Sequence, residues 1–374
     1  MRKRIIFIAL FTQIILASFV FAQTSQITNG LNYLSSTQNE EGFWASENEL
    51  TLTTAETIKT LKLLNQTSTS GYTLALSWLQ NQPLETTNHL AERIYILAAS
   101  GADSNLLTSY MYAALRAWGG YNDFTVNNLD TALALQALRA INYADQTVIQ
   151  AAINYLLTNQ NTDGGWGFYK DDTSNVYMTA IVSRTLQHFP QTTAIANAVG
   201  KASTFIIAKQ NSGGGFGSSS PTVYETALAY IALVGVTTDN TVLGNAAQFI
   251  TNAQLPNGSW NDDPYTTALA LQALYYSVNK PPPPTPSAAT ITGAVISDST
   301  KQTLKGVSVV LQSNTAINTT TDATGKFTLT NVPKGAQQIS FSLAGYATAT
   351  VSVNATEGAL INLGNIPLLS LIHI

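Results

Sequence analysis

The sequence predicts a multidomain chain, in which an all-α array of six helix pairs precedes a small all-β sandwich. Two observations predict this order. A helix-and-turn pattern recurs about every 43 residues through residues 23–279, which is typical of stacked helical repeats. After a proline-rich linker at residues 280–288, short β-rich runs of alternating polarity occupy residues 289–368.

Four copies of one sequence pattern define the helical repeats. In each copy, three residues separate an aromatic–aliphatic pair from a Gln, and three more separate that Gln from a Gly-x-aromatic turn. Glycine is expected here because it adopts tight-turn conformations without strain. The aromatic residues are expected to pack between helices rather than to bind a ligand. The Gln, Gly and aromatic residues of the four copies are Gln38, Gly42, Trp44, Gln160, Gly164, Trp166, Gln210, Gly214, Phe216, Gln254, Gly258 and Trp260.

Two further units are degenerate. Residues 76–100 keep the helix pair but lack the Gly-x-aromatic turn, and the unit that begins at Ser104 lacks the Gln. Gly119-Gly120-Tyr121 is expected to provide the turn and the aromatic residue of that second unit. With the four complete copies, these units give six helix pairs.

The two helices of a pair differ in polarity. The helix before each Gln has one apolar stripe, as in residues 148–156, whereas the helix after each turn is apolar on nearly every side, as in residues 131–138. The first kind is therefore expected outside and the second kind inside. An open solenoid and a closed ring both fit the period, and the all-apolar second helices favour the ring.

The repeated sequence pattern resembles the QW motif of the terpenoid cyclase and protein prenyltransferase repeat superfamily, over residues 26–279. The resemblance implies an α6/α6 toroid in which the Gln caps the next helix and the aromatic residue packs against it. The catalytic signatures of that superfamily are absent. The chain has no Asp-x-Asp-Asp run, no cysteine and only three histidines, which are too few ligands for a closed zinc site. We expect no cofactor and no metal.

The C-terminal stretch resembles the carboxypeptidase regulatory-like domain, a prealbumin-like β-sandwich. The resemblance rests on the order of residues 291–295, Thr321-Asp322 before Gly325-Lys326-Phe327, residues 331–335 and Gly345-Tyr346. Strands are expected at residues 291–296, 307–311, 326–329, 339–343 and 347–353. Residues 369–374 do not fit the pattern and are interpreted as a tail, either artefactual or leading into a further domain.

The N-terminus predicts export. A basic start at Arg2-Lys3-Arg4, an apolar run over residues 5–21 and the small residue Ala22 have the pattern of a signal peptide over residues 1–22. The apolar run is short for a membrane span of about 20 residues, and a lone membrane anchor is the alternative. The mature protein is expected in the periplasm, at the cell surface or in the medium, without a membrane span.

Acidic residues form one candidate constellation. Aligning the second helices places Glu56, Glu92, Asp130 and Glu225 at one repeat position. In a closed ring these acids would face one end of the cavity, where burial and repulsion could raise a carboxyl pKa enough for general acid catalysis. The simpler explanation is the helix dipole, which favours a first-turn acid by about 0.3–1 kcal/mol. The candidate ligand-binding residues at the same mouth are Tyr224, Tyr265, His89 and Arg93.

The composition narrows the function. Only 10% of the residues are charged and the net charge is -4, so nucleic acid is not expected as a partner. We expect an exported, non-catalytic repeat protein that binds a polyprenyl chain, a glycan, a peptide or an envelope protein. The alternative is an enzyme with cyclase-like or glycan-cleaving activity that uses the four acids.

Overall fold

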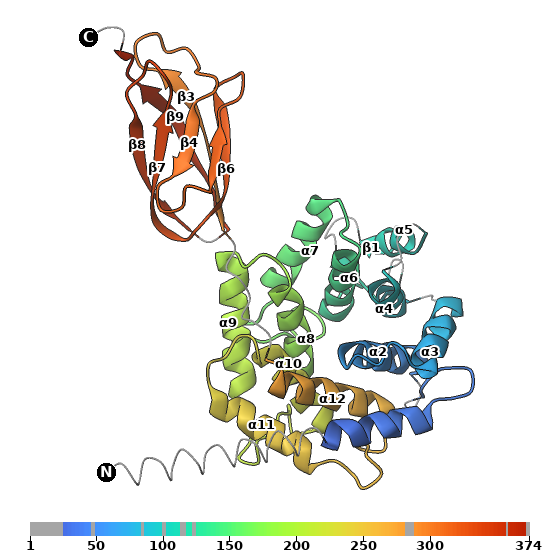
Figure 1. The fold of residues 1–374 in the computed structure, drawn as a ribbon. Coiled ribbons are helices and arrows are strands. Elements are labelled where there is room, and N and C mark those ends of the chain that lie inside the picture. The colour runs from blue at the N-terminus through green and yellow to red at the C-terminus, as the bar shows by residue number, and fades with distance from the viewer. Residues whose placement is uncertain are drawn as a thin grey trace, which may run out of the picture. The chain divides into compact units, whose positions relative to one another are not determined.

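The computed structural model describes residues 25–45, 49–83, 86–98, 102–112, 117–121, 125–280, 288–356 and 358–371. The signal peptide expected at residues 1–22 lies outside this range, as does most of the linker. The chain divides into two compact units (Figure 1). The helical unit takes in the residues up to His188 and Ala198–Pro283, and the β unit takes in Phe189–Asn197 and the residues from Pro284 onward.

Six inner helices form the wall of a closed ring. Each inner helix packs on the next one, and the last packs on the first, which closes the ring (Figure 1). The all-apolar sequences lie here, because a helix that is buried on every side needs apolar residues on every side. The toroid expected from the sequence is therefore confirmed. The inner helices are α2 (Leu50–Leu63), α4 (Thr87–Leu97), α6 (Asn128–Ala140), α8 (Val176–Gln187), α10 (Val223–Leu233) and α12 (Pro264–Val278).

The outer helices cover the ring with one apolar stripe each. In α11 (Asn240–Asn252) the buried residues include Val242, Leu243, Ala246 and Ile250, which lie on one face of the helix. The other outer helices are the one over residues 25–37, α3 (Ser70–Asn81), α5 (Ala102–Ser109), α7 (Gln146–Thr158) and α9 (Thr193–Ile207).

The repeated Gln joins each turn to the following outer helix. The side-chain amide of Gln160 donates hydrogen bonds to the carbonyl of Gly164 in its own turn and to that of Ala198 in α9, both over 2.8 Å. These acceptors are carbonyl oxygens, so the amide bridges two segments, and the expectation that it caps a helix is corrected. Equivalent bonds to the next outer helix join Gln38 to Gly71, Gln210 to Val242, and Gln254 to Gln26.

The repeated Trp joins the two helices of one unit. The indole N–H of Trp166 donates to the carbonyl of Leu156 in α7 over 2.8 Å, and its backbone N–H donates to Thr179 Oγ1 in α8 over 3.0 Å. Trp44 and Trp260 make the same two kinds of bond, and all three rings are buried. Packing between helices, as expected from the sequence, is therefore their role.

The third unit departs from the expected pattern. Trp118, not Tyr121, makes these bonds, to Leu107 and Thr131, and Trp118 is fully buried whereas Tyr121 is 49% exposed. The expectation for Tyr121 was wrong because the aromatic residue here precedes the two glycines. It ends a short hairpin formed by β1 (Met111–Tyr112) and β2 (Ala117–Trp118), which replaces the usual turn.

The turn positions accept only glycine, as expected. Gly164 has a φ of +90°, and a Cβ added there would lie 2.7 Å from the carbonyl oxygen of Lys201. Gly258 also has a φ of +90°, and a Cβ added there would lie too close to the carbonyl oxygen of Asn29. The left-handed φ and the close approach of the next outer helix both exclude a side chain.

The β unit is a sandwich of two sheets. One sheet has the order β6 (Lys326–Val332), β3 (Ala289–Ser297), β9 (Leu360–Leu368), and the other has β5 (Asn318–Thr320), β4 (Ser308–Leu311), β7 (Gly335–Ser342), β8 (Ala349–Ala355). Strands β5 and β9 were not expected. Residues 369–371 continue beyond β9 and bond to Gly345 and Ala347, so this part of the expected tail packs on the sandwich.

Candidate functional site

The repeated Thr of the inner helices sets their register around the ring axis. Thr54, Thr131, Thr179, Thr226 and Thr267 each accept a hydrogen bond from the backbone N–H of the aromatic residue in their own unit. Residues that stand the same number of positions from this Thr in the sequence therefore lie at one level along the ring axis. The position two residues after it holds, in these five helices, Glu56, Leu133, Ile181, Leu228 and Leu269.

This register corrects the alignment of the four acids. Asp130 and Glu225 come one residue before the repeated Thr, whereas Glu56 comes two residues after it. Glu56 therefore lies almost one helical turn further into the ring. The sequence alignment paired Glu56 with the wrong threonine, because Thr53, Thr54 and Thr57 are all available in α2.

A narrow cavity occupies the axis of the ring. A water molecule's centre can reach about 80 Å³ of it, which is room for several waters. Glu56 and Glu92 line it, and Asn88 and Glu92 of α4 stand four residues apart, as Leu52 and Glu56 do in α2. Lys59, Gln136 and Arg184 also line it. The remaining lining residues are apolar or aromatic: Leu52, Leu129, Leu133, Tyr177, Ala180, Ile181, Leu228, Tyr265 and Leu269.

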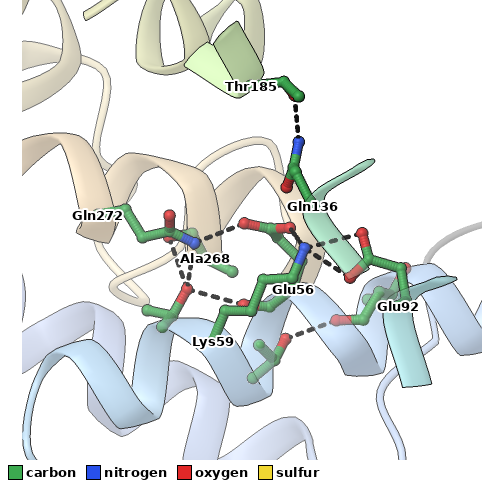
Figure 2. Close-up of polar contacts among 10 residues, drawn as sticks. Glu56, Lys59, Glu92, Gln136, Thr185, Ala268 and Gln272 are labelled. Carbon is green, nitrogen blue, oxygen red and sulfur yellow. Dashed lines mark hydrogen bonds and ion pairs between the residues drawn. The ribbon is translucent and has the colours of Figure 1, made fainter. Parts of the chain in front are cut away.

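One lysine joins the two glutamates in the cavity wall. Lys59 Nζ lies 3.1 Å from Glu56 Oε2 and 2.6 Å from Glu92 Oε2, and it donates to Glu92 Oε1 over 2.8 Å (Figure 2). Lys59 and Glu56 belong to α2 and Glu92 to α4, so the ion pairs link neighbouring inner helices. We call Glu56, Lys59 and Glu92 the charged triad.

Two glutamines extend this polar layer around the ring. Gln272 of α12 donates to Glu56 Oε1 over 2.5 Å and to Thr60 Oγ1 over 2.9 Å, which ties the triad to the closing helix (Figure 2). On the other side, Gln136 of α6 donates to Thr185 of α8 over 2.7 Å.

The two glutamates of the triad differ in acidity. Burial raises the pKa of Glu56, but Lys59, the Gln272 hydrogen bond and Arg184 outweigh burial and hold that pKa below its ordinary value. Burial also raises the pKa of Glu92, and there the charge of Glu56 adds to it, so the pKa lies above its ordinary value despite Lys59. Burial alone lowers the pKa of Lys59, yet the two glutamates raise it overall. Glu92 is therefore the weaker acid of the two glutamates.

Glu92 also keeps one oxygen free of hydrogen bonds. Its Oε2 is buried and accepts no hydrogen bond of good geometry, although Lys59 lies within ion-pair distance. Glu92 as a whole is only 7% exposed. A buried oxygen without a hydrogen bond is costly unless a proton or a ligand occupies it.

The other two acids have local partners at helix ends. Asp130 Oδ2 accepts from Asn127 Nδ2, and Glu225 Oε2 accepts from Thr222 Oγ1, each within the first turn of its helix. Burial raises the pKa of Asp130. Neither residue lines the central cavity, so the structure does not bring the four predicted acids together.

The predicted ligand-binding residues separate in the same way. Tyr265 lines the central cavity, and Tyr224 lines a neighbouring pocket that shares Tyr265 with it. Arg93 is bound to Asp103 and His89 Nε2 lies 3.5 Å from Glu49, and neither lines the cavity.

Sequence reasoning missed Tyr177 and Lys59. Tyr177 lies at the level of Tyr265, and neither hydroxyl makes a hydrogen bond to the described residues. Burial raises the pKa of Tyr177 to about 12. Tyr177 could have been found from the repeated threonines, because Tyr177, Tyr224 and Tyr265 each stand two residues before one of them.

The described part of the chain has neither a metal-binding cluster nor a helix that could span a membrane. It contains no group of three or more His, Cys, Asp or Glu residues that could hold a metal ion. None of its helices is both long and apolar enough to cross a membrane.

Comparisons with known proteins agree with both domains. Residues 131–279 match the squalene-hopene cyclase C-terminal domain, and residues 291–366 match the CarboxypepD_reg-like domain. Both resemblances inferred from the sequence are confirmed. The cyclase-like match covers inner helices α6, α8, α10 and α12, whereas Glu56, Lys59 and Glu92 lie before it. No curated protein sequence matches the chain.

Solved structures resemble the chain at low identity. A protein from Actinoplanes has a TM-score of 0.57 and 15% identity, over 68% of this chain and 99% of that one. The ent-copalyl diphosphate synthase from Streptomyces platensis has a TM-score of 0.49 and 19% identity, over 61% of this chain and 50% of that one. The apo type II terpene cyclase MstE from Scytonema has a TM-score of 0.37 and 14% identity, over 70% of this chain and 99% of that one. The first likeness supports the fold alone, and the other two are too distant to support an inference.

Proposed function

We propose that the helical unit is a cyclase-like enzyme that takes a short unsaturated hydrocarbon chain into its central cavity and rearranges it with a proton from Glu92. One observation carries the proposal: a buried carboxyl group with a raised pKa lies in a cavity otherwise walled mainly by aliphatic and tyrosine side chains. The similarity of residues 131–279 to a cyclase domain supports the same class of reaction.

The proposed reaction is an isomerisation and needs no co-reactant. Glu92 Oε2 transfers its proton to one carbon of a double bond, which leaves a carbocation on the other carbon. A second double bond of the same chain attacks this cation and forms the new ring bond. Loss of a proton from a neighbouring carbon to the Glu92 carboxylate restores both the double bond and the acid.

The walls of the cavity suit this chemistry. Apolar side chains exclude water that would quench a carbocation, and tyrosine rings such as those of Tyr177 and Tyr265 attract a cation through their faces.

Deuterium incorporation tests the proposal. The full chain is incubated in D₂O with a panel of acyclic polyprenyl hydrocarbons and alcohols, and products are separated by gas chromatography with mass spectrometry. We expect cyclic isomers that carry deuterium, and none from Glu92→Gln. Glu225→Gln, a buried acid outside the cavity, is the control and should retain activity. Product formation by the Glu92→Gln variant would exclude Glu92 as the acid.

Binding without chemistry is the second candidate. The observation that favours it is the position of Lys59, which compensates the charge of both glutamates and gives the triad a structural role. Native mass spectrometry of the purified chain, before and after mild denaturation, tests this candidate. A ligand that dissociates on denaturation, together with no product from any substrate, would support binding alone.

We also propose that the chain is exported, on the basis of the signal-peptide pattern over residues 1–22. N-terminal sequencing of the protein from its native cells should begin at Gln23. A mature chain that begins at Met1 would exclude cleavage.

A further inference from the structure

A second pocket opens at the end of the ring where the inner helices finish. A water molecule's centre can reach about 420 Å³ of this pocket, and apolar side chains such as Leu63 and Ile96 form part of its wall. Four basic residues also line it, and its lining includes no acidic residue. We call these four residues the basic mouth: Lys59, Lys62, Arg139 and Arg184.

Composition does not explain this gathering of charge. Lys and Arg are 17 of the 374 residues, and the net charge of the chain is -4. Yet four of the twelve residues that line the pocket are Lys or Arg. The positive charge is therefore concentrated locally in a chain that is otherwise weakly acidic.

Helix dipoles account for only part of the arrangement. Lys62, Arg139 and Arg184 stand in the last turns of α2, α6 and α8, where a cation is favoured by the free carbonyl groups. The same argument applies to every inner helix, but α4, α10 and α12 have no basic residue in their last turns. The basic residues thus cluster on one side of the mouth.

Three of the four cations lack a carboxylate partner. Lys59 is compensated by Glu56 and Glu92, but Arg184 makes no hydrogen bond or ion pair with the described residues, and neither does Lys62. Among the described residues, Arg139 donates only to the carbonyl of His188, over 2.9 Å. The four cations of the basic mouth outnumber Glu56 and Glu92, whose charges act on Arg184 as well as on Lys59. The remaining positive charge favours a dianion over a singly charged carboxylate.

We propose that the basic mouth binds a phosphorylated ligand, whose phosphate lies between Arg184, Arg139 and Lys62. Two guanidinium groups suit the bidentate recognition of phosphate oxygens, and Lys62 adds a point charge. The body of the ligand is apolar or aromatic, because Leu63, Ile96 and Tyr276 form the remaining wall. The site goes beyond the proposed cyclase function and does not depend on catalysis at Glu92.

Isothermal titration calorimetry of the full chain tests the site. The probes are hexyl phosphate, hexanoate, hexanol and inorganic phosphate. We expect hexyl phosphate to bind at one site, more tightly than inorganic phosphate because of its apolar chain, and at least tenfold more tightly than hexanoate. Hexanol should show no binding.

Charge-matched variants locate the site. Lys62→Gln with Arg139→Gln should weaken hexyl phosphate at least tenfold, and so should Arg184→Gln alone. The control is Lys201→Gln with Lys209→Gln, which removes the same charge from two exposed lysines and should leave the affinity within twofold. Lys62 is itself exposed, so its substitution should not prevent folding.

His188 provides a second readout, which is measured on the unmodified chain and does not depend on whether a variant folds. Burial and the charges of Arg184 and Arg139 lower the pKa of this imidazole to about 4. Bound phosphate should raise that pKa in an NMR titration. Three outcomes would each overturn the proposal. They are an equal loss of hexyl phosphate affinity in the Lys201/Lys209 control, an affinity for hexanoate equal to that for hexyl phosphate, and a His188 pKa that does not change when phosphate binds. None of these measurements involves turnover, so a failure of the cyclase proposal would leave their outcome unaffected.

Discussion

The side-chain amide of Gln254 donates a hydrogen bond to the backbone carbonyl of Gln26 over 2.9 Å, across 228 residues of chain. The bond is equivalent to the one that Gln160 makes to the neighbouring outer helix within the array. The last repeat thus contacts the first as any repeat contacts its successor. The helical unit is a ring without terminal caps, in contrast to an open solenoid, whose end repeats lack one neighbour.

Gln254→Ala should therefore cost as much stability as Gln160→Ala. Each variant loses two hydrogen bonds to backbone carbonyls, and we expect a loss of about 1–3 kcal/mol in the free energy of unfolding. Urea denaturation measures it. Gln248→Ala, which alters only an exposed pair on α11, is the control and should change stability by less than about 0.5 kcal/mol. A negligible effect at Gln254 would contradict a closed ring.

Trp118 and Tyr121 should respond oppositely to truncation. Trp118→Ala removes a fully buried indole and should cost about 3–5 kcal/mol, whereas Tyr121→Ala, at a half-exposed position, should cost less than about 1 kcal/mol. Thermal unfolding of both variants measures the difference. Trp118→Phe keeps most of the packing and isolates the hydrogen bond to Leu107.

Lys59 should be required only while the two glutamates are charged. Lys59→Gln leaves two buried carboxylates without a cation and should cost about 3–5 kcal/mol. In the triple variant Lys59→Gln, Glu56→Gln, Glu92→Gln no buried charge remains, and most of the stability should return. If the triple variant is no more stable than Lys59→Gln, ion pairing is not the reason for the loss.

The pH dependence of stability should change in opposite directions at the two glutamates. The raised pKa of Glu92 means that the folded state holds this proton more tightly than the unfolded state, so its ionisation destabilises the fold as the pH rises. Glu92→Gln should therefore gain stability, relative to the unmodified chain, between pH 4 and pH 7.

The lowered pKa of Glu56 has the reverse consequence. Its carboxylate contributes stability above the unfolded pKa, and that contribution is lost as the pH falls. Glu56→Gln should therefore lose more stability at pH 7 than at pH 3. Urea denaturation at each pH measures both variants, and the same slope of stability against pH for the two would contradict the assignment of Glu92 as the weaker acid.

Strand β9 offers a matched pair of positions. Ile366 is 6% exposed and Leu360 is 72% exposed on the same strand. Ile366→Asp places a charge in the sandwich core and should destabilise the β unit by about 4 kcal/mol, while Leu360→Asp should have little effect. Limited proteolysis of the full chain measures both. Equal resistance of the two variants would mean that β9 is not part of the core.

Local patterns predicted the fold well where they repeat. The Gln and Gly positions identified four units, and the all-apolar second helices indicated a ring. Both signals can be read from the sequence because they depend on residues that lie close together along the chain. The third unit failed for Tyr121, since an inserted hairpin moves the aromatic residue ahead of its glycines. Strand β9 was missed because Gly364 and Pro367 interrupt its alternation, while its parallel pairing with β3 connects distant residues.

The site was harder to predict than the fold because it depends on register. A shift of three residues separates Glu56 from the level of Asp130. Helix α2 contains five threonines, and Thr53, Thr54 and Thr57 all lie within three residues of Glu56. The ion pair between Lys59 and Glu92 spans two helices, so no spacing within one helix reveals it. The hydrogen bond from Trp44 to Thr54 shows that register in the structure.

Closure of the ring also constrains the order in which the chain can fold. The contacts of α12 with α2 and of Gln254 with Gln26 cannot form until the last helix pair has been synthesised. Until then, the apolar faces of the first and last available repeats remain uncovered, and the final step must join ends that are more than two hundred residues apart. Newly made chains that stop before residue 278 should therefore bind chaperones that recognise exposed apolar helices, and release should coincide with docking of α12.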